Sequence, residues 1–190
     1  MIIKLAFSGK QRSGKDTAAQ YVIKKLKNHF RFKNVIFNSM RIGLADEVKR
    51  LCSEGLNRDD RDSLQKFGTE VIRKGCKQYF DTEDFWVNIF LYKVKNFIDY
   101  SAVTCILCTD VRFPNEVKRL QADGFKVVRL EVKPDQQVNR ADGKEVVNLD
   151  HESETALDNY KGFDWVIPPC DLKGLYQNLD YLIGEWYRND

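Results

Sequence analysis

Residues 5–18 read LAFSGKQRSGKDTA, and this stretch decides the fold. An apolar run leads into Gly9, four residues separate Gly9 from Gly14, and Lys15 opens a run of helix formers. This is the G-x-x-x-x-G-K spacing of a Walker A phosphate-binding loop. Glycine lets the backbone turn tightly and approach phosphate, while backbone amides and the positive end of the next helix attract the anion. Because the string lies between an apparent strand and an apparent helix, an ordinary glycine turn is the weaker alternative.

The loop predicts a nucleotide site in which Lys15 reaches the β- and γ-phosphates. Asp16 stands where the usual loop has a Ser or Thr hydroxyl that ligates Mg²⁺. A carboxylate is also a hard oxygen ligand and suits Mg²⁺, directly or through water. For Thr17, capping or packing the helix start is the simpler role. We expect ATP and Mg²⁺, the metal through Asp16, to be held by Gly9, Lys10, Gln11, Arg12, Ser13, Gly14, Lys15, Asp16 and Thr17.

The composition fits a single domain over residues 1–190, of which 43% are hydrophobic. A formal net charge of +3 is too small to indicate a nucleic-acid scaffold. No stretch approaches the ~18 consecutive apolar residues of a membrane span, and the apolar run before the glycine loop is too short for a signal peptide. We therefore expect a cytosolic protein that binds neither membranes nor nucleic acids.

The chain has five cysteines, and Cys105 and Cys108 form a CxxC pair. This pair lies inside the apolar run AVTCILC, and no second pair is present to complete a zinc site. Buried reduced thiols are therefore expected.

Short apolar strands alternate with helices, which favours an α/β fold with a parallel sheet covered on both faces. We expect strands near residues 2–8, 34–38, 102–108, 126–132 and 163–167, with 102–108 inside the sheet. We expect helices over residues 13–30, 41–56, 84–98, 113–124 and 172–187. Residues 61–80 are helical in pattern but polar, with breaks near Gly68 and Gly75. Residues 133–150 lack apolar periodicity and predict a loop or mobile flap.

Ligands of parallel sheets bind at the carboxyl ends of the strands, and Asp110 and Arg112 follow the central strand. Asp110 is suited to hold metal-bound water or to orient a substrate hydroxyl, with a turn or helix cap as the alternative. Arg112 is suited to clamp phosphate with two hydrogen bonds, with a surface ion pair to Glu116 as the alternative. Arg12 adds a charge inside the loop. The candidate catalytic residues are Lys15, Arg12, Asp16, Asp110 and Arg112.

Arg61 and Arg73 lie in the polar segment 61–80, where the phosphate of a second substrate could bind. For each of them a solvated helix face is an equal alternative. In the stretch DHESE, His151 is a lone histidine among three acids, and Ser153 fits a capped helix start. No second His or Cys is near it in the sequence to complete a metal site.

Five stretches occur in the order found in phage-type deoxynucleoside monophosphate kinases: FSGKQRSGKDTAA, RDSLQKFGTEVIR, DFWVNIF, TDVRFPNEV and DHESETALDNY. The chain resembles this family over nearly its whole length, and GKDT, with Asp16, belongs to the family's own pattern. The glycine loop and the tail ESETALDNYKGFDWVI are also similar to animal-type phosphomevalonate kinases, which share the nucleoside monophosphate kinase fold.

The resemblance implies a P-loop NTPase fold of the nucleoside monophosphate kinase type, with a five-stranded parallel sheet. It implies a hinged acceptor-binding segment at about 39–98, and a lid at about 133–150 that brings Arg140 near the phosphates. It further implies Mg²⁺-dependent transfer of the γ-phosphoryl group of ATP to a deoxynucleoside 5′-monophosphate, in the host cytoplasm. Phosphomevalonate is the rival acceptor, and a homodimer stays open.

Matched motif by motif, the implied acceptor residues are Ser39, Arg61, Gln65, Gly68, Thr69, Arg73, Trp86, Arg112, His151 and Glu154. For Trp86, packing in the interior is at least as good an interpretation as stacking on a base. Two other classes of protein stay open. One is a P-loop protein that binds nucleotide without turnover, and the other is a DNA-associated ATPase, which the small net charge does not favour.

Overall fold

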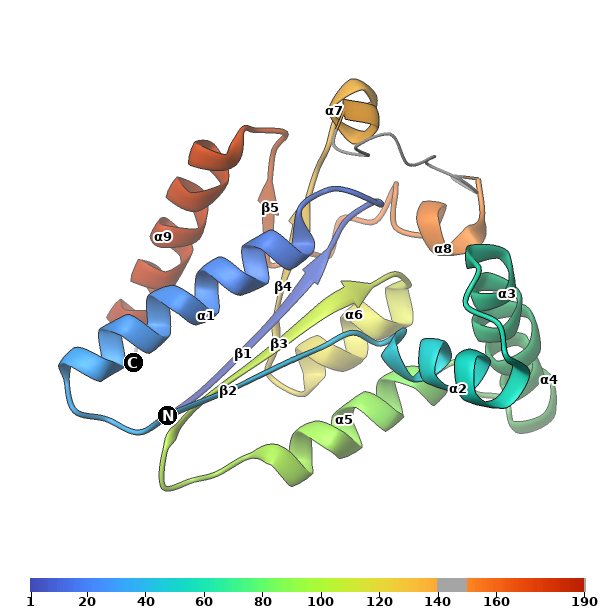
Figure 1. Cartoon of the computed structure of the whole chain (residues 1–190), viewed down its shortest axis with the longest axis horizontal. Coiled ribbons are helices and arrows are strands. Elements are labelled where there is room, and N and C mark those ends of the chain that lie inside the picture. The colour runs from blue at the N-terminus through green and yellow to red at the C-terminus, as the bar shows by residue number, and fades with distance from the viewer. Residues whose placement is uncertain (140–149, 190) are drawn as a thin grey trace.

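The computed structural model describes residues 1–139 and 150–189. Its centre is a sheet of five parallel strands: β1 (Ile2–Ser8), β2 (Phe37–Ile42), β3 (Val103–Val111), β4 (Lys126–Leu130) and β5 (Trp165–Ile167). The spatial order is β2-β3-β1-β4-β5 (Figure 1). The predicted parallel sheet is confirmed, and β3 lies inside it as expected. Because β1 is central, the glycine loop that follows it opens at the middle of the carboxyl edge.

Helices cover both faces of the sheet, which explains why the strands are apolar on both sides. The covering helices are α1 (Lys15–Phe32), α5 (Phe85–Phe97), α6 (Pro114–Ala122) and α9 (Leu172–Asn189). Leu5 and Phe7 of β1 pack into a core with α1 and α9. Ala6 points to the opposite side, into a core with α5 and α6. The alternation along β1 therefore builds the two cores of a three-layer domain.

A group of shorter helices stands beyond the carboxyl ends of the strands (Figure 1). It comprises α2 (Asp46–Leu56), α3 (Arg61–Gln65), the π-helix η1 (Lys66–Arg73), α4 (Lys74–Phe80) and α8 (Glu152–Thr155). The first four follow β2 and fall in the segment predicted to bind the acceptor. A small core of Val48, Cys52 and Trp86 joins them to α5. The chain then brings α8 to the same end of the molecule from a distant part of the sequence.

The predicted bounds of the second strand are wrong. β2 begins at Phe37 instead of residue 34 and extends to Ile42. The apolar residues Val35 and Ile36 lie in the irregular stretch just before the strand and are 40% and 67% exposed. Pairing with β3 sets the register of this edge strand, which is why its own hydrophobicity is a poor guide. Ser39 consequently lies within the strand, not after it.

Two other local predictions also change. Residues 61–80 stay helical through Gly68 and Gly75, because the chain widens into η1 where a break was expected. Part of the predicted flap is a helix, α7 (Pro134–Asn139). The remainder of the predicted lid, residues 140–149 with Arg140 and Gly143, lies outside the described residues.

Cys105 and Cys108 belong to opposite faces of β3, because side chains alternate along a strand. Burial raises the pKa of the Cys105 thiol to about 12, and it raises the pKa of Cys108 as well. Both thiols are buried, as predicted. Across residues 1–139 and 150–189, no three His, Cys, Asp or Glu side chains gather in a metal-binding group.

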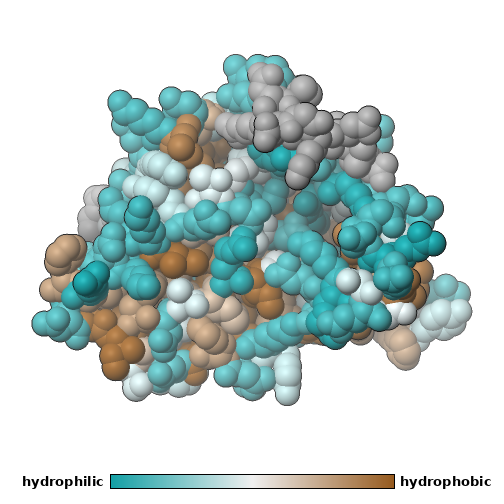
Figure 2. Space-filling model, viewed as in Figure 1, coloured by the Kyte–Doolittle hydropathy of each residue, from teal (hydrophilic) through white to brown (hydrophobic). Residues whose placement is uncertain are grey.

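Figure 2 shows one face of the molecule, on which hydrophilic side chains predominate and hydrophobic ones gather mainly toward the lower left. Among the described helices, none combines the length and the apolar character that crossing a membrane requires.

Candidate active site

A cavity of about 930 Å³ opens at the carboxyl edge of the sheet. Its walls come from the glycine loop, the ends of β2 and β3, the helices α2, α3 and η1, and α8. Its cationic side chains are Arg12, Lys15, Arg41, Lys49, Arg61, Arg73 and Arg112, and its acidic ones are Asp16, Asp46, Asp110, Glu116 and Glu154. Small-ligand pockets span about 300–1,000 Å³, so this cavity is large enough for two small substrates. Its cationic excess favours anionic ones.

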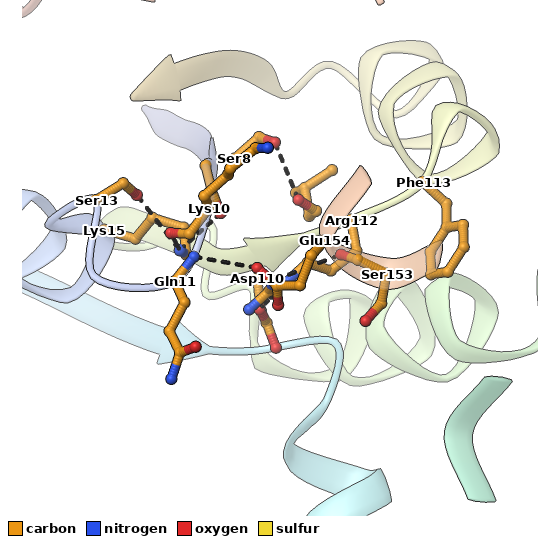
Figure 3. A network of polar contacts seen from close by, with 12 residues as sticks. Ser8, Lys10, Gln11, Ser13, Lys15, Asp110, Arg112, Phe113, Ser153 and Glu154 are labelled. Carbon is orange, nitrogen blue, oxygen red and sulfur yellow. Dashed lines mark hydrogen bonds and ion pairs between the residues drawn. The ribbon is translucent and has the colours of Figure 1, made fainter. Parts of the chain in front are cut away.

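The glycine loop has the conformation that its sequence predicts. Arg12 has φ +64° and Gly14 has φ +96°, so the chain enters the left-handed region twice before α1 begins at Lys15. Lys15 Nζ donates to the carbonyl oxygens of Gly9 and Lys10, each at 2.8 Å. Figure 3 shows the lysine side chain lying against its own loop. The loop carbonyls therefore fix the position of the Lys15 ammonium group.

The charge of Lys15 depends on its surroundings. Burial lowers the pKa of Lys15 to about 7, and the Arg112 guanidinium adds to the effect. The carboxylates of Asp110, Glu154 and Asp16 act in the opposite direction. An anion bound in the loop would favour the charged form and raise the pKa again. Lys15 is thus suited to stabilise negative charge that gathers on a phosphoryl group.

Gly9→Ala is expected to destabilise the protein and to weaken nucleotide binding. A Cβ at residue 9 would lie 2.3 Å from Ser13 Oγ and 2.7 Å from the carbonyl oxygen of Leu130. The serine can rotate away, but the backbone carbonyl cannot move without shifting β4. Overpacking of this kind costs about 1–3 kcal/mol, which in a domain of this size lowers Tm by roughly 2–12 °C.

Differential scanning calorimetry measures this effect, with Gly55→Ala as the matched control. Gly55 lies in α2, and a Cβ there meets no atom of the described residues within 4 Å. Because alanine is the better helix former, the control should melt at or above the temperature of the unmodified protein. Equal melting temperatures for the two variants would contradict the tight packing of the loop.

Arg112 lies between two carboxylates beyond the end of β3 (Figure 3). Its Nε donates to Asp110 Oδ1 at 2.6 Å, and its Nη1 donates to Glu154 Oε1. The alternative of a side-chain ion pair with Glu116 is wrong, since Glu116 accepts the backbone N–H of Arg112 at 2.7 Å. Burial opposes ionisation of Asp110, but Arg112 and Lys15 outweigh it and hold the pKa of this carboxyl below its ordinary value.

Glu154 links three parts of the site. Its Oε1 accepts from Arg61 Nη2 at 2.5 Å as well as from Arg112, and its Oε2 accepts from the Gln11 backbone N–H at 3.1 Å. Figure 3 shows Glu154 between the glycine loop and Arg112. One carboxylate on α8 therefore joins the loop after β1, the first residue of α3 and the segment after β3.

Arg73 is engaged by the protein itself. Its Nη2 pairs with the buried Glu116, and its Nη1 donates to Glu83 O at 3.0 Å and to Asn115 Oδ1 at 3.2 Å. The guanidinium carbon lies 3.8 Å from the centre of the Phe113 ring. Burial raises the pKa of Glu116, and Arg73 works against this rise. These contacts favour a structural role for Arg73, holding η1 against α6, over direct contact with an acceptor.

Most predicted site residues line the cavity: Gln11, Arg12, Gly14, Lys15, Asp16, Thr17, Arg61, Gln65, Gly68, Thr69, Arg73, Trp86, Asp110, Arg112 and Glu154. Ser13 lines a smaller neighbouring pocket. The walls of the large cavity, as far as the structure describes them, do not include four other predicted residues: Gly9, Lys10, Ser39 and His151. His151 caps α8 through its Nδ1, which accepts the Ser153 N–H at 3.1 Å. Arg140 lies outside the described residues.

Two buried polar side chains reach the cavity wall here, Gln65 at the end of α3 and Thr69 in the π-helix η1. Gly68 is pressed against α2, where a Cβ would lie 3.2 Å from a methyl group of Val48. The indole N–H of Trp86 donates to Gly68 O at 2.9 Å, and the indole is buried. Of the two roles open to Trp86, these contacts favour packing.

Sequence reasoning missed Arg41, which lines the cavity and pairs with Asp16. The misplaced second strand hid it, because Arg41 lies next to the true carboxyl end of β2. It also missed Glu116 as part of the site. Here a signal was present, since Glu116 stands at the capping-box position and accepts the Phe113 N–H at 3.1 Å.

Asp16 is the residue best placed to hold Mg²⁺. Its side chain is 71% exposed and lines the cavity together with Thr17. Carboxylate and hydroxyl oxygens suit Mg²⁺, which usually keeps several water ligands and binds phosphates. Arg41 pairs with Asp16 in this structure, but exposed ion pairs are weak and separate easily. The residues present therefore fit a Mg²⁺ ion held by Asp16 and by the phosphates of a nucleotide.

No family model matches the chain, and no curated protein sequence matches it. Its structure is similar to that of shikimate kinase from Bacteroides thetaiotaomicron, with a TM-score of 0.53, 16% identity, and coverage of 97% of this chain and 98% of that one. It is also similar to shikimate kinase from Acinetobacter baumannii in complex with shikimate, with a TM-score of 0.52, 11% identity, and coverage of 100% of this chain and 96% of that one. A gluconokinase from Sinorhizobium meliloti 1021 is similar with a TM-score of 0.52, 10% identity, and coverage of 99% of this chain and 97% of that one. The chain thus has the α/β P-loop NTPase fold seen in small-molecule kinases.

Proposed function

We propose that the protein transfers the γ-phosphoryl group of ATP to the phosphate of a deoxynucleoside 5′-monophosphate, giving ADP and the diphosphate. The observation that carries the proposal is that the glycine loop shares one cavity with Arg61 and Arg112. Phosphoryl transfer depends on charge neutralisation and in-line positioning, and this arrangement offers cations to both substrates. The similarity of the fold to that of kinases supports the same class of reaction.

The charge of the cavity supports an acceptor that is itself a phosphate ester. A 5′-monophosphate carries about −1.5 to −2 charges at neutral pH, and guanidinium forks are well suited to it. Arg61 Nε is buried and has no hydrogen-bond partner within the described part of the chain. A buried donor of this kind is expected to find a partner, and an acceptor phosphate would supply one. The resemblance of LQKFGTE and DFW to the phage-type kinases favours a deoxynucleotide over phosphomevalonate.

We assign the adenine of ATP to a second pocket of about 170 Å³ on the other side of the glycine loop. Ser13, Gly14 and Thr17 line it on the loop side, and Leu130, Ile167 and Leu175 add apolar surface. An apolar slot beside a phosphate loop is suited to a flat base whose phosphates continue into the large cavity.

Acceptor preference at saturating ATP and Mg²⁺ tests the proposal. The panel contains the four common deoxynucleoside monophosphates, the matching ribonucleotides, phosphomevalonate, shikimate and gluconate, with ADP release as the readout. We expect turnover with at least one deoxynucleoside monophosphate. Turnover with phosphomevalonate and none of the nucleotides would replace the assignment with that of a phosphomevalonate kinase. ATP binding without turnover on any acceptor would indicate a non-catalytic nucleotide-binding protein.

Asp16→Asn is expected to weaken the Mg²⁺ response, so that more Mg²⁺ is needed for activity, and to lower turnover. Nucleotide binding should largely survive. The amide keeps the shape of the side chain but loses the charge that suits it to Mg²⁺. If Asp16 acts through metal-bound water, the midpoint of a Mg²⁺ titration should rise by about 10–100-fold. Asp16→Ser should restore much of the activity, because serine fits the usual loop.

Arg41→Met is the matched control, since it removes the ion-pair partner of Asp16 and leaves the carboxylate. Under the metal assignment, this variant keeps the Mg²⁺ midpoint of the unmodified protein. A shift in Arg41→Met equal to that in Asp16→Asn would show that Asp16 acts through Arg41. An unchanged titration curve for Asp16→Asn would leave Asp16 as a favourable charge at a helix start.

A further inference from the structure

The contacts of Glu154 differ from those of a residue that binds a substrate. Its side chain is 1% exposed, although it belongs to the wall of a large cavity. Both carboxylate oxygens receive hydrogen bonds from the protein, two from guanidinium groups and one from a backbone N–H of the glycine loop. A carboxylate would also repel an acceptor phosphate that came into direct contact with it.

We propose that Glu154 is a positioning residue, which fixes Arg61 and Arg112 relative to the glycine loop so that the acceptor phosphate is held in line with the donor. This inference rests on the proposed function and deepens it. In this inference Arg61 and Arg112 contact the acceptor phosphate, and Glu154 determines the positions of their guanidinium groups.

The topology makes such a link necessary. Arg61 is separated from Glu154 by 93 positions in the sequence, Arg112 by 42, and Gln11 by 143. These residues stand on separate elements, and long arginine side chains have many rotamers to choose from. A shared buried carboxylate selects one arrangement, because each donor loses a charge-assisted hydrogen bond if it turns away.

Glu154 is itself held firmly, as a positioning residue must be. Its helix α8 starts at the His151 cap, and the His151 carbonyl oxygen accepts the Glu154 N–H at 2.8 Å. Leu157, one turn later, is buried in the core beneath α6. The backbone that carries the carboxylate is therefore anchored on both sides.

Arg61, Arg112 and the Gln11 backbone N–H all donate to Glu154, and this makes Glu154→Gln a sharp test. A carboxylate can accept on both oxygens, whereas an amide must turn its NH₂ group toward one of the donors. The variant keeps the size and shape of the side chain. It therefore removes the attraction that orients the arginines while disturbing the packing little.

The experiment measures acceptor and donor binding separately by calorimetry, in the full chain, with Mg²⁺ and a non-hydrolysable ATP analogue. For Glu154→Gln we expect the Kd of the preferred deoxynucleoside monophosphate to rise about 10–100-fold, the loss that misplaced charge-assisted hydrogen bonds give. The Kd of the ATP analogue alone should stay near that of the unmodified protein, because Lys15 is held by the carbonyl oxygens of Gly9 and Lys10 and not by Glu154. If Glu154 had a purely structural role, the variant would bind both the acceptor and the ATP analogue more weakly.

Glu152→Gln is the matched control, since Glu152 lies on the same helix but is exposed and stands 3.8 Å from Lys74. It should bind both ligands like the unmodified protein. If Glu154→Gln fails to fold, Glu154→Asp keeps the charge and withdraws it by one methylene, and it should show the same selective loss. Acceptor binding by a folded Glu154 variant equal to that of the unmodified protein would overturn the inference alone. Failure of the unmodified protein to bind any acceptor monophosphate would overturn the proposed function as well.

Discussion

Lys15→Ala is expected to abolish turnover, lowering kcat/KM at least ~100-fold. Lys15 Nζ lies 2.8 Å from the carbonyl oxygens of Gly9 and Lys10, at the base of the glycine loop. From there its ammonium group can stabilise the negative charge that develops on the oxygens of the transferring phosphoryl group. Losing a contact that strengthens in the transition state costs on the order of 3 kcal/mol or more. A coupled ADP-release assay at saturating ATP measures the loss.

Lys10→Ala is the matched control within the same loop. Lys10 carries the same charge, but its Nζ is directed away, 2.8 Å from Asp158 Oδ2, in a partly exposed ion pair. Exposed ion pairs contribute little, so this variant should keep most of the activity. Turnover by Lys15→Ala equal to that of the unmodified protein would rule out the glycine loop as the donor site.

The lowered pKa of Lys15, about 7, gives the same variant a second readout. Bound phosphate favours the charged lysine, so the pKa rises on ATP binding. Above the pKa of the free protein, binding must then take up a proton, and affinity should fall as the pH rises from that value toward the pKa of the complex. Calorimetry in buffers of different ionisation enthalpy measures the uptake. In Lys15→Ala the uptake due to this group should disappear.

The fold could be predicted largely from local pattern, because strand-loop-helix order and the glycine spacing are local features. Strand β2 shows where this stops. Its sequence FNSMRI is polar, and its register comes from pairing with β3, which lies more than sixty residues away. The same error concealed Arg41, since only the correct end of β2 places that residue at the cavity.

The residues of the candidate site could be predicted from motifs, but the partners of its charges could not. Arg73 and Arg112 both read as phosphate-binding arginines in the sequence. In the structure Arg73 pairs with Glu116, whereas Arg112 pairs with Asp110 and Glu154. These pairings depend on which elements meet at the carboxyl edge, and sequence spacing carries no information about that.

Arg112→Ala is expected to lower both stability and turnover, and its effect on stability should be the largest of these variants. Arg112 is 19% exposed and neutralises two carboxylates, Asp110 and Glu154, of which the second is almost fully enclosed. Removing one partner from a buried ion pair costs about 3–5 kcal/mol, which lowers the Tm of a domain of this size by roughly 6–20 °C. Turnover should fall as well, since the variant loses a guanidinium group of the proposed acceptor site. Calorimetry and the ADP-release assay measure the two effects.

Arg50→Ala is the matched control, because Arg50 also bridges two carboxylates, Glu47 and Glu54, but on the surface of α2. Its Tm should stay close to that of the unmodified protein, since exposed ion pairs are screened by water and salt. Similar losses in the two variants would show that burial does not strengthen the Arg112 contacts.

The pH dependence of the Arg112→Ala loss separates charge from packing. In the unmodified protein the pKa of Asp110 is lowered, so its contribution to stability is present above its ordinary pKa and is lost only as the pH falls through the lowered value. Without Arg112, the burial that opposes ionisation of Asp110 is countered by Lys15 and Lys49 but no longer by a hydrogen-bonded guanidinium, so the pKa of Asp110 should rise. Protonation of Asp110 then removes its unpaired charge as the pH falls, so the Tm deficit of the variant should shrink as the pH is lowered from neutral toward the raised pKa. A deficit that stays constant over this range would mean that Arg112 stabilises the fold through packing and not through its charge.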